Sequence, residues 1–245
     1  MGAKTQGYPV AEGLFLTAMT RYNLPMRKGL VILTLLAACT PLHRRAGAVE
    51  VDFVVANRLH QEGKAAEALP YYRSAVAKEP RNPLYLYYYG VALAETGDTT
   101  RATEAFEIIL RANPGDALAA DALGTIYMVR GELREAIELY NALEKANPGY
   151  RSLARVRKAR AYLMLSETDS LFAEASGALK DSPFSPEAWY LLACYYSRAG
   201  DRDNALRALE NAIDLDNSLR KKARADEAFS AIAEDPVFKW MTRGD

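Results

Sequence analysis

Four side chains of this sequence are suited to nucleophilic, redox or metal chemistry, namely Cys39, Cys194, His43 and His60. Two cysteines cannot staple a disulfide-rich domain, and two histidines are too few ligands for a histidine-based metal site. The sequence also lacks the phosphate-loop pattern GxxxxGKS/T, the zinc pattern HExxH, the nucleophile pattern GxSxG and the redox pattern CxxC. We therefore expect no catalytic residues, no metal and no cofactor, and we do not expect an enzyme.

The composition indicates a globular chain. Of its 245 residues, 50% are hydrophobic and 25% are charged, so it can bury enough apolar surface to offset the entropy lost on ordering. The 31 basic and 31 acidic side chains give a formal net charge of zero. A nucleic-acid-binding protein normally carries a basic excess. Neither nucleic acid nor a small-molecule substrate is an expected partner.

Cys39 ends the most apolar run of the sequence, residues 29–39, which read GLVILTLLAAC. A membrane-spanning helix needs about 20 apolar residues, so this run is too short to be one. Arg27 and Lys28 precede it, and basic residues before a short apolar run are typical of a secretory signal.

The end of this run, Leu36-Ala37-Ala38-Cys39, resembles the lipobox of bacterial lipoproteins. The resemblance implies that the Cys39 thiol receives a diacylglycerol and that the chain is cut just before it. Residues 1–38 would then be an N-terminal extension with a signal peptide, and 39–48 a lipid-attachment linker. Thr40 stands where an aspartate would favour the inner membrane, so the resemblance implies the periplasmic face of the outer membrane.

Other interpretations of the N-terminus stay open. An ordinary secretory signal could be cut after Ala46-Gly47-Ala48, although Arg44 and Arg45 lie between the apolar run and that position. The run could also be a buried helix of a cytosolic protein. Met1, Met19 and Met26 are alternative start positions.

A spacing of 34 residues recurs through the rest of the chain. It separates Pro80, Pro114 and Pro148, and Pro183 follows at 35. Glycines recur at 63, 97 and 131, and Gly200 has similar neighbours in the sequence. An alanine lies five positions after each of these glycines. Leu123-Gly124, with Tyr127 and Tyr140, completes the best copy. This pattern resembles the tetratricopeptide repeat, in which each copy is a pair of antiparallel helices.

The resemblance implies an all-α solenoid of about five helix-turn-helix repeats, followed by a segment that covers the exposed end of the array. Phe229, Ile232, Phe238, Trp240 and Met241 are expected to form the apolar face of that segment; a tail that docks elsewhere is the alternative. The expected copies are 49–82, 83–116, 117–151, 152–185 and 186–219, and the expected cap is 220–245.

Particular residues are expected to start and stop these helices. The recurring glycines can adopt a left-handed conformation that ends the first helix of a copy. Asp98 and Asp201 are expected to begin second helices, and Asn82-Pro83 and Ser185-Pro186 first helices. The fourth copy departs from the pattern, because Ser166 replaces the glycine and Leu171 the alanine. Leu171 is expected to push the helices apart or to turn outward, which would make the array least regular there.

Stacked first helices line the concave face of such arrays, where related proteins bind peptides. A protein or peptide is therefore the expected partner, alongside a membrane through the lipid on Cys39. Phe53 and Asp121 argue against the carboxylate clamp of the chaperone-tail subgroup, which needs a lysine and no acid. The residues expected to face this groove are Asn57, Tyr87, Val91, Asp121, Thr125, Met128, Val156, Arg160, Tyr190 and Cys194. Cys194 and the tyrosines have an alternative interpretation as core residues.

A basic run begins at the last residue of the third copy and continues into the fourth. Its members could bind an anionic lipid head group or an acidic peptide, or they could form a solvated helix face. They are Arg151, Arg155, Arg157, Lys158 and Arg160.

The sequence thus predicts a lipid-tethered scaffold or adaptor that mediates protein–protein interactions in a bacterial envelope. An accessory subunit of a cell-wall or envelope-assembly enzyme and a cytosolic scaffold are the alternatives.

Overall fold

The computed structural model describes residues 50–243. The chain divides into two units, Met1–Asp52 and Phe53–Asp245, and the helices discussed here belong to the second. Every regular element within 50–243 is a helix, and no strand occurs there. The all-α prediction is therefore confirmed. Cys39, the apolar run and the linker 39–48 lie outside the described residues.

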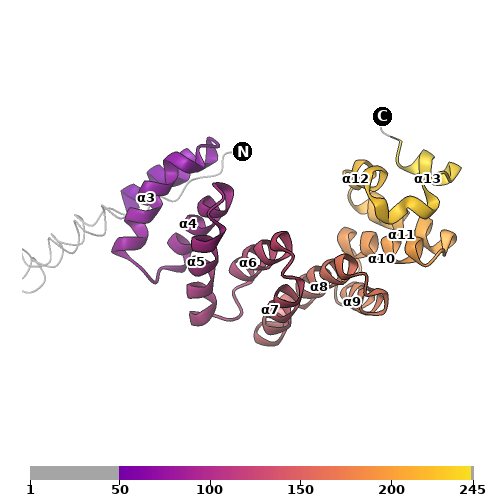
Figure 1. Ribbon diagram of the computed structural model, residues 1–245, viewed down its shortest axis with the longest axis horizontal. Helices are drawn as coiled ribbons and strands as arrows, with labels where there is room; N and C mark the ends of the chain where they lie inside the picture. The colour runs from indigo at the N-terminus through magenta and orange to yellow at the C-terminus, as the bar shows by residue number, and fades with distance from the viewer. Residues whose placement is uncertain (1–49, 244–245) are drawn as a thin grey trace, which may run out of the picture. The chain divides into compact units, whose positions relative to one another are not determined.

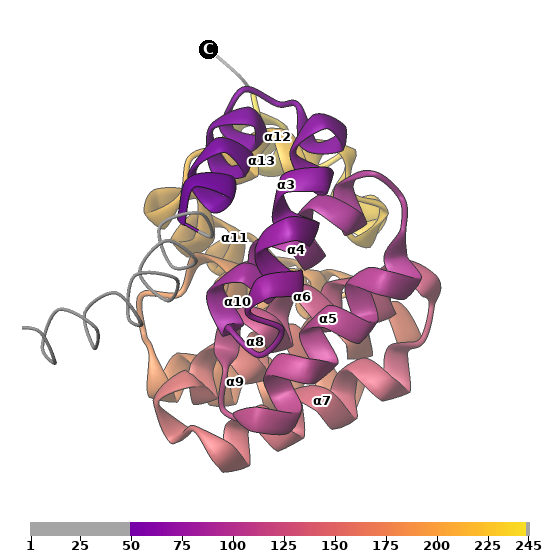
Figure 2. The same ribbon diagram turned by 90° about the vertical axis from the view of Figure 1, so that its left-hand side faces the viewer.

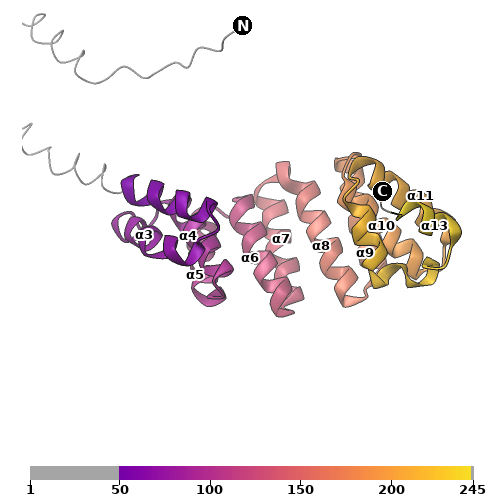
Figure 3. The same ribbon diagram turned by 90° about the horizontal axis from the view of Figure 1, so that it is seen from above.

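The helices follow one another as hairpins, and each helix packs against its neighbours in the chain (Figures 1, 2 and 3). Residues 53–61 of the second unit are helical, and Ala56 shares an apolar cluster with Ala68 and Tyr72 of the first labelled helix. The helices of the hairpins are α3 (Ala65–Lys78), α4 (Pro83–Glu95), α5 (Thr99–Ala112), α6 (Ala117–Arg130), α7 (Leu133–Ala146), α8 (Arg151–Leu165), α9 (Thr168–Asp181), α10 (Pro186–Arg198) and α11 (Arg202–Leu215). The short 3-10 helix η1 (Pro148–Tyr150) precedes α8, and α12 (Leu219–Ala225), η2 (Glu227–Ile232) and α13 (Pro236–Met241) follow α11.

The helix boundaries lie where the caps were predicted. Asn82 begins α4, and its Oδ1 accepts hydrogen bonds from the backbone N–H of Leu84 at 3.0 Å and of Tyr85 at 3.4 Å. Asp98 and Asp201 cap α5 and α11 in the same way, through the N–H groups three residues on. Such caps satisfy backbone donors that the first helical turn leaves unpaired.

Left-handed residues end the first helices. The four turn glycines have φ between +76° and +89°, at Gly63, Gly97, Gly131 and Gly200. Ser166 takes the same conformation with φ +58°, although it carries a side chain. The turn geometry is thus kept in the fourth hairpin without the glycine.

Small residues let the paired helices approach closely. A Cβ added at Gly124 of α6 would overlap Oη of Tyr140 in α7, so the tyrosine occupies the space that any larger residue would need. Gly90 of α4 meets Phe106 of α5 in the same manner, and there an added Cβ would lie 2.8 Å from the ring.

Of the two alternatives predicted for Leu171, the outward-turned side chain is wrong. This side chain is only 1% exposed, so it is buried rather than turned to solvent. Ala159, Ala175 and Ala178 belong to the same apolar cluster. Their small side chains leave the volume that a leucine needs between α8 and α9.

Most of the predicted apolar face of the C-terminal segment packs onto the array. Phe229, Ile232, Phe238 and Met241 are buried, but Trp240 is 71% exposed. Phe238 and Met241 lie three positions apart and share one side of α13, so Trp240 projects from another side. Trp240 therefore does not belong to the packed face.

Candidate interaction surface

The residues predicted to face the groove lie on first helices but fall into two classes. Asn57, Tyr87, Val91, Asp121, Thr125 and Arg160 retain some exposure. Met128, Val156, Tyr190 and Cys194 are buried, with at most 8% of their surface exposed. These four are core residues of the folded chain, because neighbouring helices cover them, so their assignment to an open groove is corrected.

The C-terminal segment covers Tyr190 and Cys194. The Tyr190 hydroxyl donates a hydrogen bond to Oδ2 of Asp226 at 2.7 Å, and its ring meets Phe229 edge-on at 5.5 Å. Nζ of Lys222 lies 4.3 Å from the centre of the same ring, which is a cation–π contact. Burial raises the pKa of the Cys194 thiol well above its usual value, so this cysteine is a core thiol and not a nucleophile.

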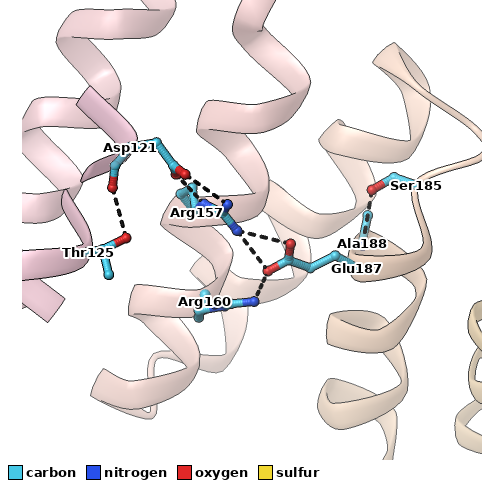
Figure 4. Close-up of polar contacts among 7 residues, drawn as sticks. All are labelled: Asp121, Thr125, Arg157, Arg160, Ser185, Glu187 and Ala188. Carbon is cyan, nitrogen blue, oxygen red and sulfur yellow. Dashed lines mark hydrogen bonds and ion pairs between the residues drawn. The ribbon is translucent and has the colours of Figure 1, made fainter. Parts of the chain in front are cut away.

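An ion-pair network links three first helices, as Figure 4 shows. Arg157 of α8 donates from Nε to Oδ1 of Asp121 in α6 at 2.5 Å and from Nη1 to Oε2 of Glu187 in α10 at 3.0 Å. Arg160 also pairs with Glu187. The hydrogen bond to Asp121 raises the pKa of Arg157, so the guanidinium stays charged.

On α6, α8 and α10, the charged side chains that a ligand would need already form ion pairs within the chain. Asp121 and Arg160 already have partners within the chain, and the Thr125 hydroxyl donates to the backbone oxygen of Asp121 at 2.8 Å. A guest in this part of the face would have to displace internal ion pairs.

The other side of α8 carries the rest of the basic run. Lys158 is only 4% exposed, and its Nζ lies 2.8 Å from Oε2 of Glu144 and 2.9 Å from Oε1 of Glu174. Burial alone would raise the pKa of Glu144, but the hydrogen bond from Lys158 and the charges of Lys158 and Arg155 lower it.

Arg151 and Arg155 both pair with Glu144 and Asp181. The basic run is therefore not a vacant anion site, because every member pairs with an acidic side chain of the chain. Arg151 remains exposed to solvent, whereas Lys158 is buried.

A polar cluster joins the first two hairpins. The Tyr72 hydroxyl donates to Oδ1 of Asn57 at 2.9 Å and lies 3.1 Å from Nδ1 of His60, whose Nε2 lies 2.8 Å from Oε2 of Glu95. Burial raises the pKa of Tyr72 to about 12, so its hydroxyl stays protonated at neutral pH. The side-chain oxygen of Asn57 thus already accepts a hydrogen bond from within the chain. Three-member groupings of histidine, cysteine, aspartate and glutamate that could hold a metal are absent from residues 50–243.

The open part of the face lies at the start of α4 and α6, and sequence reasoning missed most of it. A cleft of about 280 Å³ is lined by Pro83, Leu84, Tyr87, Tyr88, Ile109, Asp116 and Leu118. Leu84 is 51% exposed and Leu118 is 64% exposed. These two leucines occupy the same position of successive repeats, 34 residues apart. That spacing of apolar residues outside the core positions was the signal available in the sequence.

A second cleft continues the first. It measures about 550 Å³ and shares Pro83, Ile109 and Asp116 with it. Arg81 and Arg111 line this cleft and not the first, so we call it the outer end. Together the two form one groove across the junction of α4, α5 and α6, which we call the 84–118 groove.

The repeats can now be compared with known proteins. A sequence model described as Tetratricopeptide repeat matches residues 56–117 and 122–186, and a second of the same description matches 186–219. The chain belongs to the tetratricopeptide repeat family. Tetratricopeptide repeat arrays are protein-interaction scaffolds, and the exposed apolar side chains of the 84–118 groove fit that role.

Two curated relatives share the repeats. Cellulose synthase operon protein C of Pseudomonas fluorescens is 30% identical over 149 residues, which cover 58% of this chain and 11% of that protein. General transcriptional corepressor ssn6 of Schizosaccharomyces pombe is 30% identical over 127 residues, 51% of this chain and 11% of that protein. The tetratricopeptide repeats of this chain therefore match only a small part of each relative.

Solved tetratricopeptide repeat structures have the same fold. MamA 41-end from Desulfovibrio magneticus RS-1 gives a TM-score of 0.59 at 22% identity, over 70% of this chain and 96% of that one. TTC0263, a thermophilic protein of Thermus thermophilus, gives 0.57 at 22% identity, over 75% and 98%.

Proposed function

We propose that this protein is a lipid-tethered adaptor of a bacterial envelope, which holds protein partners on the first helices of its repeats. The observation that carries the binding part is the exposed pair Leu84 and Leu118, since two large apolar side chains facing solvent in one groove favour burial against a partner. The tether rests on the lipobox at Cys39.

Within residues 50–243 no helix is long and apolar enough to cross a bilayer. The proposed tether is the lipid on Cys39. Each buried CH₂ of an acyl chain contributes about 0.8 kcal/mol to membrane binding, so two or three chains give a stable anchor. We place the protein on the periplasmic face, in the outer membrane.

The lipid is tested with Cys39→Ser, with Cys194→Ser as the matched control. We expect Cys39→Ser to lose metabolically incorporated palmitate and to leave the membrane fraction, whereas Cys194→Ser keeps both properties. Intact mass should show the diacylglyceryl increment only when Cys39 is present. Membrane attachment and mass that do not depend on Cys39 would contradict the tether and favour a cytosolic scaffold.

The adaptor role is tested with a photo-crosslinking amino acid placed at 84, 118 or 125 in intact cells. Protein adducts are expected at one or more of these positions. The control position is 138, an exposed residue of α7. An absence of protein adducts at all three first-helix positions, with or without the lipid, would contradict the adaptor role.

A second candidate is an accessory subunit of an envelope enzyme. The observation that supports this candidate is the similarity to a protein named for a cellulose synthase operon. It predicts that the adducts from 84 and 118 contain one enzyme in constant proportion, and that deleting this chain lowers the activity of that enzyme.

A further inference from the structure

We propose that the 84–118 groove binds a protein segment in which a large apolar side chain is followed closely by an acidic one. This inference rests on the proposed adaptor function and specifies the chemistry of the partner. The apolar side chain would lie among Leu84, Tyr87 and Leu118, and the acidic one would reach Arg81.

The inner end of the groove is apolar and held in place by packing. The Tyr87 ring meets Tyr88 at 5.5 Å and Phe106 at 6.0 Å, and Tyr88 in turn meets Phe53 at 5.6 Å. Neighbouring rings already restrain these tyrosines. Binding a partner therefore costs little further side-chain entropy. Large, half-buried tyrosines are typical of the centre of a binding surface.

The outer end of the groove is basic. Arg81 is exposed and has no ion pair among residues 50–243. Arg111 is 68% exposed and reaches Glu107 only at 3.3 Å, so it keeps donors for a second acceptor. This contrasts with α8, where acidic side chains of the chain itself neutralise every basic side chain.

Neither of the two acids near the groove forms an ion pair with Arg81 or Arg111. Oδ1 of Asp116 accepts the backbone N–H of Ala119 at 3.0 Å, so its charge lies against the positive end of α6. Oε2 of Glu79 accepts from the side chain of Asn82 at 2.8 Å. The groove therefore complements an apolar residue at one end and an acidic residue at the other.

The test selects peptides from a random-peptide phage library on the full-length chain, and measures binding of the enriched peptides by calorimetry. We expect a consensus with one aromatic or large aliphatic residue and a nearby aspartate or glutamate. Leu118→Ser and Arg81→Glu should each weaken binding by about tenfold or more. Val129→Ser and Arg207→Glu are the matched controls, because both residues are exposed outside the groove.

A charge exchange makes the test specific. Replacing the acidic residue of the selected peptide by lysine should abolish binding to the natural chain and restore it to Arg81→Glu. Failure of this exchange, a basic or neutral consensus, or no enriched peptide would overturn the inference. Equal binding by Leu118→Ser would overturn it too.

Two further outcomes separate this inference from the adaptor role. Adducts at 125 without adducts at 84 and 118 would overturn the groove assignment but leave the adaptor role standing. The last arm uses phosphatidylglycerol vesicles with the unlipidated Cys39→Ser chain. Vesicle binding that Leu118→Ser and Arg81→Glu abolish would overturn the protein partner in favour of a membrane surface.

Discussion

The hydroxyl of Tyr190 donates a hydrogen bond to Oδ2 of Asp226 at 2.7 Å, which ties the first helix of the last repeat to the C-terminal segment. The bond is partly buried and its acceptor is charged, so it stabilises more than an ordinary surface bond. Tyr190→Phe should lower the free energy of unfolding by about 2 kcal/mol. Urea denaturation measures this, with the exposed Tyr150→Phe as a control expected to change little. Equal stabilities of the two variants would contradict the structural role of the bond.

The same cover should protect the thiol of Cys194. Burial raises the pKa of this thiol, so at about pH 8 the folded chain has almost no reactive thiolate. In a Cys39→Ser background, reaction with a disulfide reagent should be slow until the chain unfolds. Phe229→Ala should accelerate it, because Phe229 is 1% exposed and packs on Tyr190. A fast reaction in the natural fold would mean that the segment does not cover α10 in solution.

Replacing Ser166 should increase stability. Ser166 has φ +58°, a conformation that costs a residue with a Cβ about 1 kcal/mol relative to glycine. Ser166→Gly should therefore raise the free energy of unfolding by about 0.5–1 kcal/mol. The reverse change, Gly131→Ser, should lower it by a similar amount, since Gly131 has φ +77° and no atom within 4 Å of an added Cβ. Thermal melts of both variants check the prediction, and opposite signs are required.

Arg157 should contribute strongly to stability. Arg157→Met leaves Asp121 and Glu187 without their main partner, although both are partly exposed and water can reach them. We expect a loss of about 2–3 kcal/mol in the free energy of unfolding, below the cost for a fully buried pair. Arg111→Met is the control, because its pair with Glu107 is exposed and should contribute under about 0.5 kcal/mol. A small effect of Arg157→Met would show that the network contributes little net energy.

Alkaline pH should destabilise the fold through Tyr72. Burial raises the pKa of Tyr72 to about 12, against 10.0 for an ordinary tyrosine. The unfolded chain therefore releases this proton first, so the contribution of Tyr72 is fully present below pH 10 and is lost as pH rises toward 12. It amounts to about 2–3 kcal/mol. Burial also raises the pKa of Tyr140 and Tyr190, which steepens the loss.

The measurement is the slope of unfolding free energy against pH above the ordinary tyrosine pKa. Tyr72→Phe should reduce this slope, even though the variant starts less stable because its hydrogen bond to Asn57 is gone. An unchanged slope would exclude Tyr72 as a titrating group.

Much of the fold followed from local residue patterns. The left-handed glycines, the caps at Asn82 and Asp98 and the helix-turn-helix spacing depend on residues within a few positions of one another, so the chain order alone shows them. The burial of Leu171 was missed, because it depends on how α9 docks against α8, which contributes Ala159 to the same apolar cluster. The site was less predictable still: Tyr87 was anticipated, but Leu84 and Leu118 were not.

Side-chain pairing between repeats had to come from the three-dimensional arrangement. Asp121 and Arg157 are 36 positions apart, and whether Arg157 turns toward Asp121, toward Glu187 or to solvent depends on how α6, α8 and α10 dock. The covering of Tyr190 by Asp226 has the same origin. Helix periodicity defines which residues share a face, because it is a property of the backbone. Which faces stay open is decided by the neighbours that pack on them, and the junction of α4, α5 and α6 keeps both apolar side chains and the unpaired charge of Arg81.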